Sequence, residues 1–532
     1  MDDIRKNKLL LIGLTVAVLA PFLNKAFHID DPLFLWMAQQ IAKHPLDPYG
    51  FSVNWATFPE PMWRQMQNPP LCSYFIAAVA SLIGWSEPAL HFAFLFWAPL
   101  SILGTVAIAR RFCREAFTAA LLILFAPVFL VSATNVMCDV TLLALWLWSI
   151  ECWLAGLERK RWSFFALSGV LIAAATLTKY FGLALVPLLA IYTLFQDWKN
   201  WQRLLFLLIP IAAVMAYEFW TKSKYGQGLF TYAMFYSRTV LAGSISSFAG
   251  QLLTGLAFAG GCFIAPLFYS RRVWWLALAI IAVVFAAFYF LLPIHPDWQL
   301  GSNITLVRIE GALFAAIGVG IIALAIVDLV QRRDAESLFL ALWLIGTFVF
   351  AVFFNWSITA RTFLPMIPCA ALLVMRLVGE TRQSFFVTYG RVFAVAVVSL
   401  FVATADYRQA NTAREAAEVF RQRFQRETGT VWFQSHWGLQ YYMQQWGAKP
   451  LNARDSEITS GDLMIVPANN TAITPIGLEK VLPPEEQNFP VFPFVSTHGR
   501  GTGAAFYTGI RGPIPWAIDH VGPEMYYVAR FR

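Results

Sequence analysis

The feature that most constrains this sequence is the series of long apolar runs in its first 405 residues. A helix needs about 20 apolar residues to cross a bilayer, and about 17–25 are tolerated. About fourteen runs approach that length: 9–27, 69–84, 88–109, 116–134, 138–157, 163–178, 180–196, 203–220, 248–268, 273–292, 310–329, 336–354, 363–378 and 385–405. Hydrophobic residues make up 58% of the chain and charged residues 13%, and a soluble core cannot enclose so much apolar surface. The sequence therefore predicts an all-α polytopic membrane protein.

The run 69–84 is excluded from the predicted spans. It is short and begins with Pro69 and Pro70, and as a crossing it would place the arginines at 110–114 outside the cell. Without it about thirteen spans remain, and with the N-terminus in the cytoplasm the Lys and Arg clusters fall in short cytoplasmic loops. The first run is expected to be an uncleaved span, because no small-residue cleavage site follows it. The predicted localisation is the plasma membrane, which is the inner membrane of a bacterium.

The predicted chain has two domains, a transmembrane domain at 1–405 and an extracytoplasmic domain at 406–532. In the second, short apolar runs alternate with Gly, Pro and Asn turns, which is typical of a small mixed α/β domain. The expected strands lie at 430–433, 462–466, 504–507 and 525–529, and the expected helix lies at 436–446.

The placement of charges and cysteines argues against a nucleic-acid partner and against a disulfide framework. The net charge is +8, but the tail holds about twelve residues of each sign, so the excess belongs to the membrane part and follows the positive-inside bias. We therefore expect no nucleic-acid partner. The six cysteines all lie in or beside apolar segments, so a disulfide framework is not expected.

The first predicted external loop, 28–87, contains the sequence HIDDPLFLWMAQQIAKHP. Asp31 before Pro32 predicts a helix N-cap followed by proline at the first helical position. Apolar residues then recur on one face, so the helix is expected to lie in the membrane interface. This places the carboxylates of Asp30 and Asp31 at the membrane surface. They either cap and face solvent, or one of them acts as a general base.

Further ionisable residues lie at the predicted outer ends of spans. Such groups are costly at a membrane boundary and are candidates for function, although Lys and Arg can also extend to lipid head groups. The candidates are Asp139, Lys179 with its neighbour Tyr180, His295, Asp297 and Arg361. Because all are expected on one side of the membrane, facing the loop that carries Asp30 and Asp31, the sequence predicts a shared site.

Paired carboxylates with separate cations suit the transfer of a group from an anionic lipid carrier. An aspartate can accept the proton of an acceptor hydroxyl, while Lys179 and Arg361 neutralise the departing phosphate. This chemistry requires no cofactor. A divalent metal bridging Asp30 or Asp31 with Asp139 remains an alternative, since hard cations prefer oxygen ligands.

Four motifs resemble the polyprenyl-phosphate-dependent GT-C glycosyltransferases, in the branch of protein O-mannosyltransferases and the lipid A aminoarabinose transferase. They are IDDPLFLWMAQ at 29–39, NPPLCSYFIAA at 68–78, Asp139 with the later Thr178–Lys179 pair, and ARTFLPMIP at 360–368. The family has Asp-Glu where this chain has Asp30 and Asp31, and an Arg-Tyr pair where it has Arg361 and Thr362.

The resemblance implies a GT-C fold and an inverting glycosyltransferase of the cell envelope, hexosyl or pentosyl, with Asp30 as base. The donor would be a polyprenyl-phosphate sugar, and the acceptor a lipid, glycan or protein. Two other classes stay open. A transporter would explain many spans and the charged Glu151 inside one of them, but its binding groups would lie near the bilayer midplane. A scaffold for cell-wall material would leave the acidic pair unexplained.

Overall fold

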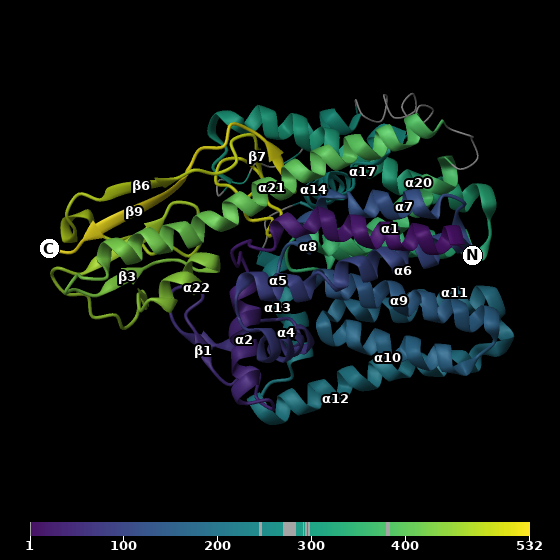
Figure 1. The fold of residues 1–532 in the computed structure, drawn as a ribbon, viewed down its shortest axis with the longest axis horizontal. Helices are drawn as coiled ribbons and strands as arrows, with labels where there is room; N and C mark the ends of the chain where they lie inside the picture. Colours follow the sequence, from purple (N-terminus) through teal and green to yellow (C-terminus); the bar gives the residue numbers. More distant parts are fainter. Residues whose placement is uncertain are drawn as a thin grey trace.

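Long helices lying side by side form most of the molecule, and the larger sheet lies at one end, near the C-terminus (Figure 1). The computed structural model describes residues 2–243, 247–269, 283–290, 292, 295, 298–378 and 384–532. The predicted span at 273–292 lies mostly outside these residues.

The helices that make up the apolar part follow one another along the chain. They are α1 (Asp2–Leu19), α5 (Glu87–Phe94), α6 (Trp97–Phe112), α7 (Ala116–Leu124), α8 (Pro127–Ala133), α9 (Cys138–Arg159), α10 (Trp162–Thr178), α11 (Leu185–Asp197), α12 (Leu208–Tyr225), α13 (Leu229–Gly243), α14 (Phe248–Cys262), α17 (Ile304–Arg332), α18 (Ala335–Phe353), α19 (Ala360–Phe363), α20 (Ile367–Val378) and α21 (Phe385–Phe424). Two short 3₁₀ segments, Tyr180–Ala184 and Trp198–Leu207, flank α11.

Within the described residues, seven helices are long and apolar enough to cross a membrane, or eight if the bent pair α7 and α8 forms one span. One of the seven, Tyr180–Tyr225, covers two predicted spans in its 46 residues. Two shorter apolar helices, Trp162–Thr178 and Phe248–Cys262, coincide with further predicted spans. The chain is thus a multi-helix membrane protein, and the number of about thirteen crossings stays a prediction.

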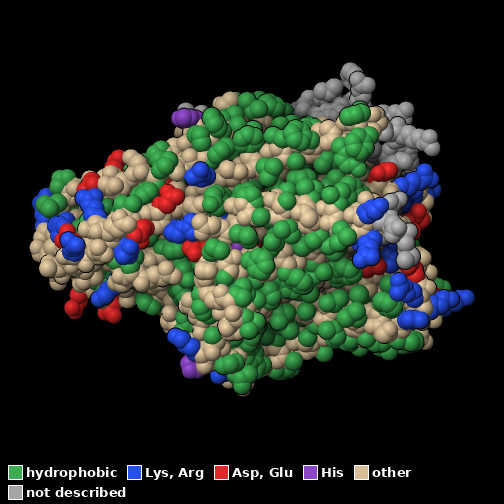
Figure 2. Space-filling view, viewed as in Figure 1, with side chains coloured by type: hydrophobic (Ala, Val, Ile, Leu, Met, Phe, Trp, Pro, Cys, Tyr) green, Lys and Arg blue, Asp and Glu red, His purple; other side chains and the backbone are tan. Residues whose placement is uncertain are grey.

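The distribution of side chains over the surface agrees with a membrane orientation. On the face drawn in Figure 2, hydrophobic side chains cover the middle of the molecule, while charged side chains gather over the C-terminal sheet and at the opposite end. Large apolar side chains are exposed on several helices, for example Phe219 on α12 and Phe393 on α21. The apolar surface in the middle suits the hydrocarbon core of a bilayer, and the two polar ends suit the water on either side.

Helices α2 (Asp31–Lys43) and α4 (Leu71–Ile83) lie between the long helices and the C-terminal sheet (Figure 1). The 13 residues of α4 are too few to span a bilayer, in agreement with its exclusion from the predicted spans. The prediction for the start of α2 was wrong by one residue, since its N-cap is Asp30. Its apolar face packs against α4 and α22 (Trp437–Gln445), and its position in the membrane interface stays a prediction.

The C-terminal part is built on a five-stranded mixed sheet with the order β4-β3-β5-β9-β6. The strands are β3 (Val431–Phe433), β4 (Lys449–Pro450), β5 (Leu463–Pro467), β6 (Glu485–Phe489) and β9 (Glu524–Arg530). Three expected strands and the expected helix are present, whereas 504–507 forms isolated bridges instead of a strand. The domain boundary expected at 405/406 falls inside α21, which continues unbroken to Phe424.

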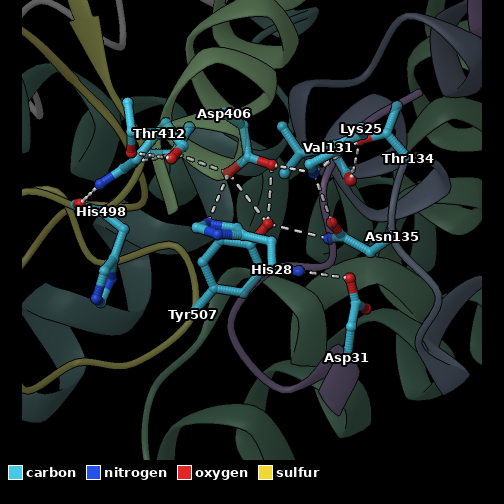
Figure 3. Close-up of polar contacts among 12 residues, drawn as sticks. Lys25, His28, Asp31, Val131, Thr134, Asn135, Asp406, Thr412, His498 and Tyr507 are labelled. Carbon is cyan, nitrogen blue, oxygen red and sulfur yellow. Dashed lines mark hydrogen bonds and ion pairs between the residues drawn. The ribbon is translucent and has the colours of Figure 1, made fainter. Parts of the chain in front are cut away.

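A fully buried ion pair joins the end of the first predicted span to this long helix. Lys25 contacts Asp406 on α21, and both side chains have no exposed surface. Lys25 also donates to Thr134 at 3.1 Å and to Asn135 at 2.5 Å, and Asp406 accepts from Thr497 at 2.8 Å (Figure 3). Three segments of the apolar part and one of the C-terminal part thus meet at one buried charge pair.

We expect Lys25→Met to destabilise the protein strongly, because the substitution leaves Asp406 buried without its counter-charge. The expected loss in the free energy of unfolding is about 3–5 kcal/mol. Denaturant unfolding in detergent measures it. The double variant Lys25→Met/Asp406→Leu should recover part of the loss, and a double variant as unstable as the single one would contradict this account.

Candidate active site

Four side chains predicted from the sequence come together in an alternating row of charges. Arg361 lies 2.8 Å from Asp30 and 3.8 Å from Asp139, and Lys179 lies 2.8 Å from Asp139. Asp139 is almost fully buried, at 2% exposed, while the Asp30 side chain is 29% exposed. Asp30, the more exposed of the two carboxylates, therefore lies at one end of the row, and Lys179 lies at the other end.

Packing of two neighbouring helices brings Asp139 and Lys179 to the same place. Asp139 lies in the first turn of α9, and Lys179 directly follows the last residue of α10. The two helices are connected by only two residues and pack against each other, so the start of one lies beside the end of the other. A carboxylate at a helix N-terminus and a cation at a helix C-terminus are both favoured by the helix dipoles.

Arg361 reaches the row from α19, a helix of four residues. Its guanidinium also contacts the sulfur of Met137 at 2.8 Å, and the preceding backbone N–H, of Ala360, donates to the carbonyl of Phe506 at 2.9 Å. Thr362, where the family has tyrosine, is buried and bonds to Thr359 at 2.9 Å. The hydroxyl therefore stabilises the local turn and does not extend toward the row.

The two carboxylates of the first loop have different surroundings. Asp31 is fully buried, and its oxygens accept the backbone N–H groups of His28 at 2.8 Å and Val136 at 3.0 Å. Burial raises the pKa of Asp31 to about 7, against the opposing effect of these two bonds. Asp31 thus ties its loop to the segment before α9, and Asp30 is the carboxylate that faces Arg361.

Asp31→Asn tests this division of roles. The amide offers one acceptor oxygen and one NH₂ group, so a backbone N–H that now donates to Asp31 would face another donor. We expect the free energy of unfolding to fall by about 1–3 kcal/mol, measured by denaturant titration. Unchanged stability with complete loss of turnover in the same variant would assign Asp31 to the chemistry instead.

The remaining candidates lie outside this row. The ring of Tyr180 lies 5.2 Å from that of Phe230, and His295 is exposed with its ring 6.4 Å from Trp298. Asp297 lies outside the described residues.

Among the described residues no group of three or more His, Cys, Asp or Glu side chains is arranged to hold a metal ion. Asp30 and Asp139, the pair suggested for a metal, both face the guanidinium of Arg361, at 2.8 and 3.8 Å.

Sequence reasoning missed the residues behind the row. Lys25, Asp406, Asn135 and Tyr507 form a buried polar network next to Arg361 (Figure 3). The sequence does contain one sign of this network, since Lys25 lies inside the first apolar run and a charge within a span needs a partner.

Part of the sequence matches a known family, and the fold resembles solved structures. Residues 67–221 match the family described as dolichyl-phosphate-mannose-protein mannosyltransferase. The structure resembles the oligosaccharyltransferase of Archaeoglobus fulgidus in its apo form, with a TM-score of 0.51, 13% identity, and coverage of 84% of this chain and 64% of that one. The chain has a GT-C fold. The resemblance inferred from the motifs is thereby confirmed.

Two further structures are similar. One is the same archaeal enzyme in complex with an inhibitory peptide and a dolichol-phosphate, with a TM-score of 0.50, 13% identity, and the same coverage of both chains. The other is ArnT from Cupriavidus metallidurans bound to undecaprenyl phosphate, with a TM-score of 0.45, 16% identity, and coverage of 86% and 93%. The chain spans 64% of the length of the oligosaccharyltransferase. No curated protein matches the sequence.

Proposed function

We propose that this protein is an inverting glycosyltransferase that moves a sugar from a polyprenyl-phosphate donor to an acceptor hydroxyl on the extracytoplasmic side. The observation that carries the proposal is the row Asp30–Arg361–Asp139–Lys179, in which the partly exposed Asp30 lies beside Arg361 and a second cation, Lys179, lies beyond Asp139. The GT-C fold and the family match over 67–221 support the same reaction class.

The proposed reaction needs one base and one anion site. Asp30 accepts the proton of the acceptor hydroxyl as its oxygen attacks the anomeric carbon of the sugar. The bond between that carbon and the phosphate oxygen breaks on the opposite face, and the electron pair leaves with the phosphate. Arg361 and Lys179 neutralise the charge that develops there. The attack from the opposite face inverts the configuration of the sugar.

The contacts of Arg361 suggest how the donor prepares the base. Without donor, the guanidinium is paired with Asp30 at 2.8 Å. The phosphodiester of the donor carries one negative charge on two free oxygens, and the same guanidinium can bind both oxygens through parallel hydrogen bonds. When the phosphate takes that position, Asp30 loses its counter-ion and is free to accept a proton. Donor binding would therefore precede activation of the acceptor.

The arrangement of the other charges favours a transferase over a transporter. Glu151, the charged residue inside a predicted span, accepts two bonds from Arg111 at 2.7 and 3.0 Å. It is thus a paired group and not an open site along a transport path. We place the row on the extracytoplasmic side, because the Arg and Lys clusters of the short loops belong to the opposite side.

The first experiment compares the wild-type protein with Asp30→Asn on a panel of radiolabelled polyprenyl-phosphate sugars. We expect donor turnover in the wild type and a loss of about 10²–10⁴-fold in Asp30→Asn, because the amide cannot accept the proton. Lys179→Ala and Arg361→Ala should lower turnover less than Asp30→Asn does.

Asp47→Asn serves as the matched control. Asp47 is a carboxylate of the same loop, 3.7 Å from Lys224 and bonded to Tyr225, with no contact to the row. Its variant should keep wild-type turnover. Absence of turnover with every donor, together with solute flux into proteoliposomes, would replace the transferase by a transporter.

We also propose that the reaction proceeds without a metal ion, because Arg361 and Lys179 together already balance the charges of Asp30 and Asp139. Turnover should then be the same in excess EDTA as in added Mg²⁺ or Mn²⁺, measured with the same labelled donors. Loss of turnover in EDTA that returns with one of these ions would contradict this part of the proposal.

A further inference from the structure

We infer that the C-terminal domain supplies a positioning residue of the donor site, Tyr507, which holds the guanidinium of Arg361 in place for the donor phosphate. The inference rests on the proposed function, since it concerns how the phosphate is bound. It assigns to the C-terminal domain a direct part in a site whose other residues come from the first external loop and from the ends of membrane helices.

Tyr507 touches Arg361 in two ways. The guanidinium carbon lies 5.2 Å from the centre of the tyrosine ring, and one guanidinium nitrogen donates to the Tyr507 carbonyl at 3.5 Å. Tyr507 is 1% exposed, and only 11% of the Arg361 side chain is exposed. Cation–π attraction is larger when both partners are shielded from water, so this ring is a strong anchor.

The tyrosine itself is fixed at its far end. Its hydroxyl donates to the carboxylate of Asp406, with distances of 3.0 and 2.9 Å to the two oxygens, and it accepts from the amide of Asn135 at 3.0 Å. Asp406 is held in turn by Lys25 and by Thr497 (Figure 3). The ring is therefore held by hydrogen bonds to α21 and to the connection between α8 and α9, and it cannot change rotamer freely.

The backbone next to Tyr507 holds the chain next to Arg361. The carbonyl of Phe506 accepts the N–H of Ala360 at 2.9 Å, and the N–H of Gly509 donates to the hydroxyl of Ser357 at 3.0 Å. Residues 506–509 thus lie along residues 357–361. Since α19 has only four residues, these contacts from the C-terminal part contribute much of the order around Arg361.

The anchor matters most at the step when Arg361 changes partner. In the proposed reaction its guanidinium leaves Asp30, its nearest carboxylate, for the phosphate. Asp139 is 3.8 Å away, so the ring and carbonyl of Tyr507 keep the guanidinium near its position during this exchange. Holding a group in its working geometry lowers the entropic cost of binding. Loss of Tyr507 should therefore weaken donor binding more than it slows proton transfer.

The test measures binding of undecaprenyl phosphate to the full-length protein in detergent by calorimetry. Tyr507→Phe keeps the ring but loses the bonds to Asp406 and Asn135, and Tyr507→Leu loses the ring as well. We expect affinity to fall about threefold to tenfold in Tyr507→Phe and further in Tyr507→Leu. In turnover assays the KM for the donor should rise in parallel while the KM for the acceptor stays unchanged.

Tyr526→Phe is the matched control, because Tyr526 is a buried tyrosine of the same domain whose hydroxyl bonds to Thr412, away from the row. Its variant should bind the lipid phosphate as the wild type does. A double-mutant cycle separates positioning from general stability. If Tyr507 acts through Arg361, Tyr507→Phe should have no further effect on affinity in an Arg361→Ala background.

Two results would overturn the inference. One is a Tyr507→Phe variant that binds as tightly as Tyr526→Phe, or whose loss is fully additive with Arg361→Ala. The other is failure of both Tyr507 variants to fold, which would assign the tyrosine to folding. Failure of the proposed function is distinguishable from these, because the wild type itself would then neither bind the lipid phosphate nor turn over a donor.

Discussion

A charge buried in an apolar domain has no water around it, so it must find an opposite charge or hydrogen-bond partners within the chain. This requirement organises the molecule at two neighbouring places. Lys25 and Asp406 satisfy one another in the interior, and Asp139 is satisfied by Lys179 and Arg361 at the edge. In each case the partners come from distant parts of the sequence. The need to pair charges thus determines which helix ends meet, and the candidate site forms where they do.

The two ionic groups differ in what they leave accessible. The Lys25–Asp406 pair is closed, since every partner is internal and no surface is exposed. The row from Asp30 to Lys179 is open at both ends, where side chains remain partly exposed. A closed pair stabilises one arrangement of the chain, while an open one can exchange a partner for a ligand. Tyr507 contacts both groups and so links the stable pair to the exchangeable one.

The sequence predicted much of the site because its residues occupy marked positions. Asp139 begins a span and Lys179 ends another, and Asp30 precedes a Pro-containing helix start, so local pattern alone placed them on one side. The pairing of Lys25 with Asp406 was not predictable in this way, because 381 positions separate the two residues and no periodicity relates them. The same limit explains α2. Its spacing reveals an apolar face, but only the tertiary structure shows that α4 and α22 cover that face.

The unbroken course of α21 has a consequence for how such proteins can be recombined. Its 40 residues form one helix of about 60 Å that leaves the membrane part without a break, and only residues 425–430 separate it from strand β3. Adding one residue near position 405 would rotate everything beyond it by about 100° around the helix axis. A C-terminal domain taken from another protein would therefore have to be joined so that it keeps its rotation around the helix axis. An insertion of about seven residues, close to two full turns, would do this and would leave the domain facing the same side chains.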